Sequence, residues 1–547
     1  MRSFWLCLMV LALTALSCVN EPSSSGDGDS DGDMDGDGDG DGDGDGDGDG
    51  DGDGDGDSDG DVDGDGDGDG DGDGDGDGDG DGDGDADVVG TGCNPTDPES
   101  CPEGTTCECS DDGCNCVMDT DDCDTEEEVV LYLSADDSNS MANPVIARQM
   151  IRDRGFYSGR VRIYEFLNYY DFDYEAADPG TVNVTAEMRP TDDTGALYDL
   201  QIGVRAPDMG EAERRPLSLT LSLDTSGSMS GHPIAMERAS CLALASALRE
   251  GDIISMVTWD TDQAILLNSY VVDGPNDALL VNECEDLAAN GGTNLHAGLV
   301  TAYELARSNY ATGRINRVIL MSDGGANVGI TDENLIGENA NDAEGEAIYL
   351  LGVGMSEAGG YNDLLMDTVT DAGKGAYIYI DTAEEAQRMF GDRLLQNVEI
   401  AARDVQVELT MPPTFRMVEF HGEEYSEDPE EVEPQHLAPN DAMIYHQIIG
   451  SCDPSTLDMA DSVRVTANFA SPFEREPLSA TREMTLGALL TGTNENLIKG
   501  NAIVAYAQAL QDRSRVPEAL AEVQDAIEVL GDDPDLLEIE ELLTILH

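Results

Sequence analysis

Apolar and polar positions alternate along the middle of the chain with two different periods. Residues 217–223 read Leu-Ser-Leu-Thr-Leu-Ser-Leu, a period of two that is typical of a β-strand. Strand-like and helical runs then follow one another. The strand-like runs are 253–259, 264–267, 317–321, 347–353 and 376–380, and the helical runs are 234–249, 276–287, 295–307, 362–372 and 384–398. This alternation predicts an α/β fold, with a doubly wound, mostly parallel sheet covered by helices on both faces.

The regions on either side of this unit show different patterns. Strand-like runs precede it at 182–188 and 199–204 and follow it at 405–411, 416–420, 443–449 and 462–470, which predicts a β-rich flanking region. The acidic run 423–433 is expected to be a solvated loop. Helical patterns at 495–511, 516–530 and 535–546 close the chain, with Pro517 and Pro534 at helix starts, where proline is tolerated. We expect these helices to form a cap.

The first residues have the pattern of an export signal. Arg2 supplies a positive start and residues 4–16 an apolar core. Leu16-Ser17-Cys18 resembles a bacterial lipobox, which implies cleavage before Cys18 and a lipid on that cysteine; an ordinary secretory peptide is the alternative. The apolar run is too short for a usual membrane span, and no later span is found, so we expect a tethered protein. Because Val19 follows Cys18, where an Asp would resemble an inner-membrane signal, the outer membrane is favoured.

An almost pure Asp-Gly repeat fills residues 26–87. It has no apolar content to bury and its like charges repel, so a disordered, expanded tether is predicted. Calcium binding is the alternative, because Asp-x-Asp-x-Asp-Gly resembles the start of an EF-hand loop. That loop also needs a bidentate Glu at its twelfth position and flanking helices, and neither is present.

Cysteines are concentrated after the repeat. Their density in an exported chain predicts a disulfide-stapled module, with a metal–thiolate site as the alternative. An odd number leaves one cysteine to stay free or to pair with Cys241, Cys284 or Cys452. Cys241 lies among apolar residues of a predicted helix, which favours a buried thiol. The clustered cysteines are Cys93, Cys101, Cys107, Cys109, Cys114, Cys116 and Cys123.

Charge excludes some classes of partner. The 547 residues include 26 Lys plus Arg and 117 Asp plus Glu, for a formal net charge of −91. Nucleic acid is excluded as a partner, because phosphate binding needs a basic surface. Docking on anionic lipid by charge is disfavoured for the same reason, which leaves the lipid anchor as the expected link to a membrane.

Oxygen-bearing side chains follow two of the predicted strands. Asp224, Ser226 and Ser228 come directly after the first strand, and Asp323 follows the strand at 317–321. Thr293 lies in a Gly-Gly-Thr-Asn loop before a predicted helix. Carboxylates and hydroxyls are hard ligands that suit Mg²⁺ or Mn²⁺, and open α/β sheets bind ligands at the carboxyl ends of their strands.

In order and spacing these five residues resemble the metal-ion-dependent adhesion site of the von Willebrand factor A domain. The resemblance implies that Ser226, Ser228 and Thr293 contact the metal directly, while Asp224 and Asp323 hold its waters. The ion would be Mg²⁺, or else Mn²⁺ or Ca²⁺. The run 161–170 also resembles a segment of the bacterial subfamily often labelled calcium-activated chloride channel homologues.

The residues favour adhesion over catalysis. Neutral hydroxyls leave a divalent ion electrophilic, so an acidic residue of a protein partner can fill its open position. A hydrolase needs a positioned base, and His296 and His232, the histidines nearest the motif, are expected to be a packing or capping residue and a solvated one. We expect a lipid-anchored adhesion protein without enzyme activity. The alternatives are a structural envelope scaffold whose metal only stabilises the fold, and a metal-dependent hydrolase or channel regulator.

The sequence thus predicts a linear order of parts. They are a signal peptide (1–17), the tether (18–92), the cysteine module (93–123), an N-terminal region (124–215), the A-type domain (216–400), a β-rich region (401–490) and the C-terminal helices (491–547).

Overall fold

The structure is a computed structural model. It describes residues 105–110, 113–118, 127–136, 139–191, 196–324, 347–357, 361–452, 454–473 and 475–547. The predicted signal peptide, Cys18 and the Asp-Gly tether lie outside the described residues, as do Cys93, Cys101 and Cys123 of the cysteine module.

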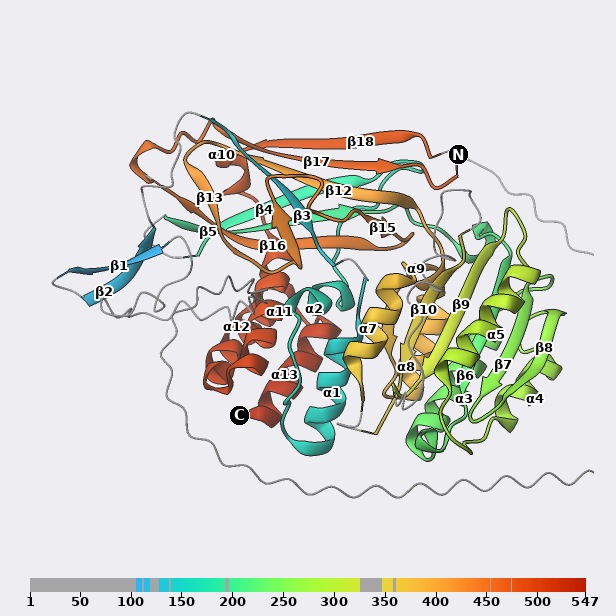
Figure 1. The fold of residues 1–547 in the computed structure, drawn as a ribbon. Helices are drawn as coiled ribbons and strands as arrows, with labels where there is room; N and C mark the ends of the chain where they lie inside the picture. The colour runs from blue at the N-terminus through green and yellow to red at the C-terminus, as the bar shows by residue number, and fades with distance from the viewer. Residues whose placement is uncertain are drawn as a thin grey trace, which may run out of the picture. The chain divides into compact units, whose positions relative to one another are not determined.

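A six-stranded sheet forms the centre of the predicted A-type domain (Figure 1). Its strands follow the order β11-β10-β9-β6-β7-β8, and neighbours are parallel except for β8, which pairs with β7 in the antiparallel sense. The central strands are buried along their whole length because helices cover the sheet. The strands are β6 (Leu217–Asp224), β7 (Ile253–Trp259), β8 (Gln263–Val271), β9 (Ile315–Ser322), β10 (Tyr349–Gly354) and β11 (Tyr377–Tyr379).

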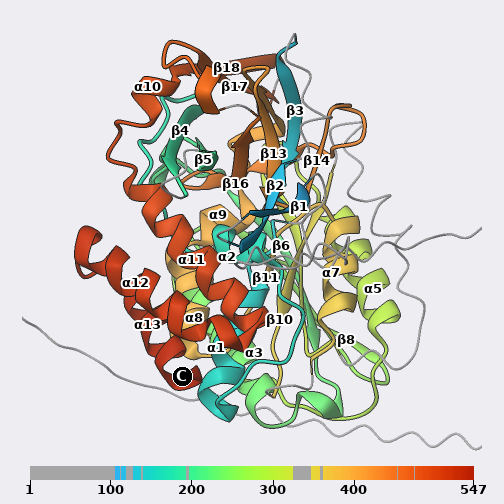
Figure 2. The same cartoon turned by 90° about the vertical axis from the view of Figure 1, so that its left-hand side faces the viewer.

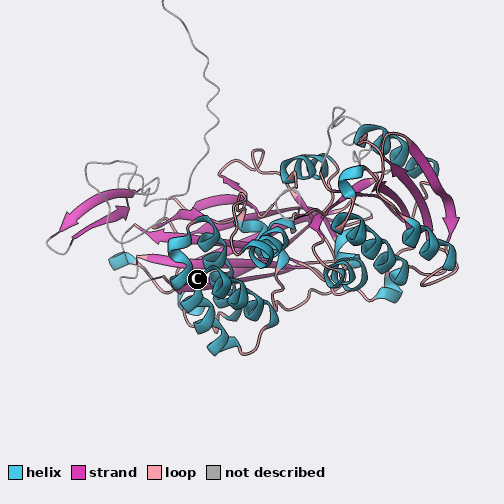
Figure 3. Ribbon diagram, turned by 90° about the horizontal axis from the view of Figure 1, so that it is seen from below, coloured by secondary structure: helices cyan, strands magenta, loops and turns pink. Residues whose placement is uncertain are grey.

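Helices lie on both sides of this sheet (Figure 3), as expected for a doubly wound α/β fold. The predicted fold class is therefore confirmed. The helices are α3 (His232–Ala247), α4 (Ala278–Asp286), α5 (Leu295–Ser308), α7 (Asp363–Ala372), α8 (Ala383–Gln387) and α9 (Leu394–Val398).

The prediction of one continuous helix over 384–398 is wrong. A π-helical segment, η5 (Arg388–Asp392), separates α8 from α9. The Arg393 amide donates to the Arg388 carbonyl, five residues back, which is the π spacing. The Asn397 side-chain amide also donates to the Met389 carbonyl at 2.9 Å. Such side-chain bonds to the backbone stabilise the local change of spacing.

Two further sheets form the β-rich region, and their strands come from segments that precede and follow the A-type domain in the sequence. One has the order β14-β3-β12-β17-β18, with β15 paired to β12, and the other β13-β16-β5-β4. Apolar side chains from both sheets share one core. The strands are β3 (Val129–Ser134), β4 (Asn183–Pro190), β5 (Leu197–Arg205), β12 (Ala402–Met411), β13 (Phe415–Phe420), β14 (Glu424–Ser426), β15 (Gln435–Leu437), β16 (Ala442–Ser451), β17 (Ser462–Ala470) and β18 (Pro477–Thr485).

The acidic run 423–433 is not wholly a loop, because β14 lies within it and pairs with β3. Most of the run is nevertheless exposed, as expected for charged side chains.

The C-terminal helices pack against helices from the start of the described chain (Figure 2). Phe166 of α2 meets Tyr506 of α11 edge to face, with ring centroids 5.6 Å apart. The run 161–170 thus forms a docked helix, as predicted. The elements are α1 (Ala142–Arg154), α2 (Ile163–Tyr169), α10 (Leu486–Leu489), α11 (Glu495–Gln511), α12 (Val516–Leu530) and α13 (Pro534–Leu546). Within the described part of the chain, no helix is both long and apolar enough to cross a membrane.

Disulfide pairing corrects one expectation about the cysteines. Cys241 of α3 is bonded to Cys284 of α4, so it is not a buried thiol. Both cysteines are buried, and burial alone does not distinguish a thiol from a half-cystine. Cys452 is disulfide-bonded as well. In the cysteine module, β1 (Thr105–Ser110) and β2 (Gly113–Met118) form an antiparallel hairpin that places Cys107 opposite Cys116 and Cys109 opposite Cys114.

Candidate metal centre

The turn after β6 carries the first three predicted site residues. Asp224 is the last residue of the strand, and Ser228 lies in the short 3₁₀ turn η4 (Gly227–Met229). The Ser226 amide donates to Asp224 Oδ1 at 2.9 Å, and the Ser226 and Ser228 hydroxyls are 3.0 Å apart. Asp224 and Ser226 are fully buried, whereas Ser228 is exposed. The turn therefore places one carboxylate and two adjacent hydroxyls at the carboxyl edge of the sheet.

The loop that carries Thr293 lies directly against this turn. The Gly227 amide donates to the Gly291 carbonyl at 3.2 Å, and the Asn290 amide donates to the Thr225 carbonyl at 2.6 Å. Gly291 has φ +75°, and a Cβ there would lie 2.8 Å from the Asp260 carboxyl, so this close approach requires glycine. Thr293 follows, half-buried, just before the N-cap of α5.

Asp323 comes directly after β9 and is buried at the same edge. Ser322, the last residue of β9, connects the two acidic turns: its hydroxyl donates to Asp224 Oδ2 at 2.7 Å and accepts from the Gly324 amide at 3.1 Å. The structure thus brings the Asp224 turn beside both the Thr293 loop and the end of β9. The sequence did not single out Ser322, because its position in an apolar run carries no signal of its own.

Electrostatics at this edge favour a cation. Burial raises the pKa of Asp224 to about 6, and the charge of Asp323 raises this pKa further, while hydrogen bonds from Ser226 and Ser322 oppose the rise. A carboxylate whose charge is disfavoured by burial and by a neighbouring acid regains its charged form when a positive ion binds.

Glu237 is a third acid in this environment and was missed from the sequence. It lies on α3 and is fully buried, and neither of its carboxyl oxygens has a hydrogen-bond partner in the part of the chain that the structure describes. Burial raises the pKa of Glu237 well above its usual range, with Asp224 and Asp323 adding to the effect. The signal that could have found it is an acid at an apolar position of the 234–249 helical pattern, three residues after Ile234 and four before Cys241.

The donor set fits a hard divalent ion. Three hydroxyls and two carboxylates are oxygen ligands of the kind that Mg²⁺, Mn²⁺ and Ca²⁺ prefer. Among the residues described, no group of three or more His, Cys, Asp or Glu side chains could hold a metal. The predicted set differs from such groups, because its expected direct ligands are the hydroxyls of Ser226, Ser228 and Thr293.

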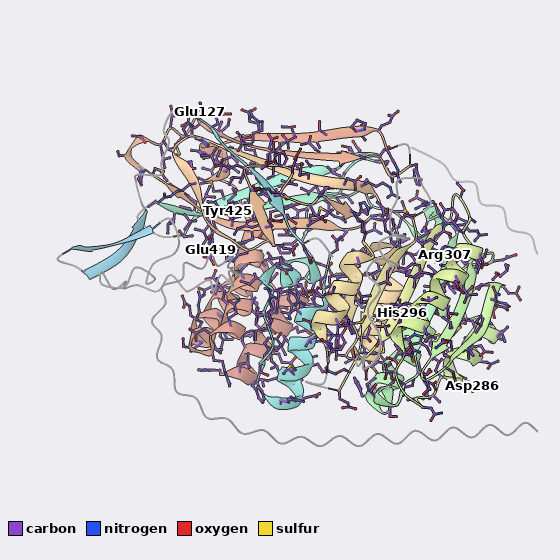
Figure 4. All side chains as sticks on the ribbon, in the orientation of Figure 1. Glu127, Asp286, His296, Arg307, Glu419 and Tyr425 are labelled. Atoms are coloured by element: carbon purple, nitrogen blue, oxygen red, sulfur yellow. A yellow bond between two sulfur atoms is a disulfide. The ribbon has the colours of Figure 1, made fainter. Side chains whose placement is uncertain are left out.

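The two histidines near the motif are both half-buried, and the expectation that His232 is solvated is wrong, because its Nε2 atom is buried. His296 lies half-buried in the first turn of α5 (Figure 4). His232 begins α3 and is half-buried too, with its amide donating to Glu357 Oε1 at 3.3 Å.

No family model matches the sequence. Among curated proteins, the chain is 32% identical over 266 residues to the uncharacterized protein YfbK of Escherichia coli, covering 47% of this chain and 45% of the relative. It is 27% identical over 215 residues to the uncharacterized protein sll0103 of Synechocystis, covering 39% and 49%. It is 26% identical over 199 residues to mouse inter-alpha-trypsin inhibitor heavy chain H3, covering 34% and 22%. The chain spans less than half the length of these relatives.

Solved structures give more distant similarities. A von Willebrand factor type A protein from Catenulispora acidiphila aligns with a TM-score of 0.41 at 13% identity, over 68% of this chain and 91% of that one. The ArnB paralog VWA2 from Sulfolobus acidocaldarius aligns with a TM-score of 0.35 at 15% identity, over 67% and 97%.

Proposed function

We propose that this protein is an exported, lipid-anchored adhesion protein whose A-type domain binds an acidic residue of a protein partner through a divalent metal ion. Ser226, Ser228 and Thr293 would hold the ion, and Asp224 and Asp323 would orient its waters. The ion supplies a positive charge with an open position for the partner's carboxylate. Catalysis is not part of the proposal.

The observation that carries the proposal is the hydrogen-bonded path Ser322–Asp224–Ser226–Ser228. It joins the end of β9 to the turn after β6, and the Gly227–Gly291 bond places the Thr293 loop beside that turn. The Ser226 and Ser228 hydroxyls already bond to each other, so they lose little conformational freedom when an ion binds. The buried acids Asp224 and Glu237 take part in no ion pair with another described residue, so a cation would offset an unbalanced charge.

Calorimetric titration of the full chain with Mg²⁺, Mn²⁺ and Ca²⁺ tests the metal site. We expect one saturable site above the diffuse binding of the Asp-Gly tract, and its loss in Asp224→Ala. Ser322→Ala should weaken this site roughly tenfold or more, because a hydrogen bond to a charged group contributes ~1.5–3 kcal/mol and 1.4 kcal/mol is tenfold.

Asp273→Ala is the matched control. It removes the same charge from an exposed position that follows β8, and the start of β7 pairs with the end of β8, so Asp273 lies at the opposite edge of the sheet. This variant should bind metal as the parent does. Equal saturable binding by the parent and Asp224→Ala would contradict the proposal.

A further inference from the structure

A cavity of about 60 Å³ lies at the amino edge of the parallel sheet, away from the metal centre. Arg317 enters it from β9, Lys374 and Gly375 from the turn before β11, Asn397 from α9 and His436 from β15. A water molecule needs roughly 10–15 Å³ of such volume, so the cavity has room for several waters or one small ion.

Arg317 is a buried cation without an acidic partner. Its side chain is 7% exposed, and its guanidinium lies over the ring of Tyr349, 4.8 Å from the centroid. The hydrogen bond that it donates goes to the neighbouring Asn316 carbonyl at 3.1 Å. It forms no ion pair with any described residue. Burial lowers the pKa of Arg317 to about 10, so it stays charged at neutral pH and bears the cost of an uncompensated buried charge.

The nearest acid, Glu399, is already engaged. Its carboxylate accepts from both Arg215 Nη2 and Arg215 Nε, the latter at 3.2 Å, and from the Ile400 amide at 3.1 Å. One Arg–carboxylate pair with a backbone donor is balanced in charge. Glu399 therefore pairs with Arg215 and not with Arg317, although Glu399 also lines the cavity and its charge acts on Arg317.

Four cations act on His436, which lines the cavity. Burial lowers the pKa of His436 to about 3, and the charges of Arg403, Arg317, Lys374 and Arg475 each lower it further. Arg403 also donates to the Tyr349 hydroxyl at 2.7 Å. Of these four cations, Arg317 and Lys374 line the cavity.

The backbone of the turn at Lys374 is constrained, and this fixes where the Lys374 side chain leaves the turn. Lys374 has φ +48°, which is uncommon for a residue with a side chain, and a Cβ on the next residue, Gly375, would lie 1.6 Å from the Leu350 carbonyl oxygen. The turn is therefore pressed against β10, and Lys374 is exposed at the cavity. No ion pair joins Lys374 to another residue in the described ranges.

Asp441 also lines the cavity, but the charges that shift its pKa belong to residues other than Arg317 and Lys374. Burial raises the pKa of Asp441 to about 6, and the charges that act on it most are those of Arg393, Arg205 and Asp171, whereas Arg317 responds to Glu399, Arg215 and Arg403. The cavity thus has a cationic end, formed by Arg317 and Lys374, that Asp441 does not neutralise.

We propose that this cationic end is a binding site for a small oxyanion, a phosphate, sulfate or carboxylate group, held by the Arg317 guanidinium and the Lys374 ammonium. A guanidinium matches two oxygens of such a group in a planar fork, and a lysine adds a mobile point charge. This site is independent of the proposed metal-dependent adhesion. It lies where β9, β15 and α9 meet, so a bound anion would stabilise the junction of the A-type domain with the β-rich region.

Thermal unfolding of the full chain in phosphate, sulfate or acetate tests the site, with chloride at the same ionic strength as the reference. We expect a saturable rise in Tm with at least one oxyanion, and the three arms identify which group binds. Arg317→Met should weaken the response roughly tenfold or more in anion concentration, because it removes charged hydrogen bonds. In chloride its Tm should equal or exceed that of the parent, because an uncompensated buried charge is removed.

Lys374→Gln, at an exposed position, keeps the test valid if Arg317→Met does not fold, and it should also weaken the response. Arg464→Gln is the control, since Arg464 is a half-exposed arginine of β17 that pairs with Glu128 at 3.5 Å. It should respond as the parent does. A parent without a saturable response to any of the three anions would overturn the proposal. So would an unchanged response in the Arg317 and Lys374 variants.

Discussion

Asp224 and Arg317 are buried charges at opposite edges of one sheet. Asp224 ends β6 at the carboxyl edge, and Arg317 lies near the start of β9, opposite Leu219 in the register of the parallel pair. Neither forms an ion pair with a described side chain, and each lies beside further charges of its own sign. Burial of unpaired charges costs several kcal/mol, so such positions indicate ligands of opposite charge. The two proposed sites follow from this shared property.

A pH dependence is expected from a pair of buried histidines in the β-rich region. The rings of His421 and His446 lie 5.2 Å apart, and burial lowers the pKa of each to about 4. The unfolded value is about 6.5, so the unfolded chain binds more protons between pH 6.5 and 4. Stability contributed by the neutral rings is therefore present above pH 6.5 and is lost as the pH falls through this window.

His446→Gln tests this dependence by urea unfolding at pH 7, 5.5 and 4.5. The glutamine amide can replace the His446 bond to Asn501 Oδ1, which is 2.8 Å long. Between pH 7 and 4.5, the free energy of unfolding of the variant should fall by about 1–3 kcal/mol less than that of the parent. The reason is that a tenfold change in proton affinity corresponds to ~1.4 kcal/mol. His547→Gln, at the exposed C-terminal residue, should follow the parent. Parallel pH profiles for the parent and His446→Gln would show that this histidine is not the cause.

At the scale of elements, the Cys241–Cys284 disulfide joins α3 to α4 across 43 residues of sequence. The chain between them includes β7 and β8, a third of the sheet's strands. The bond therefore restricts the conformations that this part of the chain can adopt when it is unfolded. In the chain-entropy account, a loop of this length contributes about 4 kcal/mol of stability.

The double variant Cys241→Ala with Cys284→Ala should be less stable than the parent by about 2–4 kcal/mol. Denaturant unfolding, with the parent in the presence and absence of a thiol reductant, measures this. Both variant side chains remain small and apolar, so the metal titration of the folded protein should be unchanged. Equal midpoints for the parent and the double variant would contradict a stabilising role for the bond.

Local patterns predicted those elements whose burial is regular. The runs 253–259, 495–511 and 516–530 match β7, α11 and α12 in both bounds. Local patterns did not predict β18. It is an edge strand whose residues are mostly exposed, so apolar alternation is absent. They also missed α1, which buries Asn143, Arg148 and Gln149. Arg148 pairs with Asp381 at 2.6 Å and with Glu385 at 2.9 Å, partners far along the chain that no local pattern includes.

The candidate metal residues could be singled out from the sequence because each lies in a short motif at the end of a predicted strand or in a loop. Ser322 and Arg317 could not, because their roles depend on which distant groups burial places beside them, whereas Glu237 left a weak signal as an acid at an apolar position of a helical pattern. Ser322 meets Asp224 across 98 residues of sequence. Arg317 comes close to His436 only when the β-rich region packs against the sheet.

At the scale of the whole molecule, the A-type domain is inserted into the β-rich region. β5 precedes the domain and β16 follows it, yet the two pair along nine register positions from Arg205–Ala442 to Leu197–Gly450. Sequence patterns predict such segments as two separate flanking regions, because long-range strand pairing leaves no local signal. The pairing fixes both ends of the inserted domain to one scaffold.

Membrane attachment is expected to depend on Cys18, which the resemblance to a lipobox makes the lipid carrier. Cys18→Ser should move the protein from the membrane fraction to the soluble fraction, because the lipid on Cys18 is the expected link to the membrane. Cell fractionation with metabolic fatty-acid labelling measures both the location and the lipid. Cys7→Ser, within the apolar core of the signal, is the control and should leave labelling intact. Labelled, membrane-bound Cys18→Ser would contradict the anchor.

The pairing of β3 with β12 has a mechanical consequence for a protein held at its N-terminal side and pulled at its metal edge. Val129, at the start of β3, pairs with Met411 at the end of β12, while β12 begins at Ala402, directly after the A-type domain. Tension would therefore enter this ladder at its two opposite ends and act along the strands. The inter-strand hydrogen bonds would be loaded in shear, all at once, and would not open one after another as in a zipper. The β-rich region would act as a force-bearing clamp between the anchor and the bound partner.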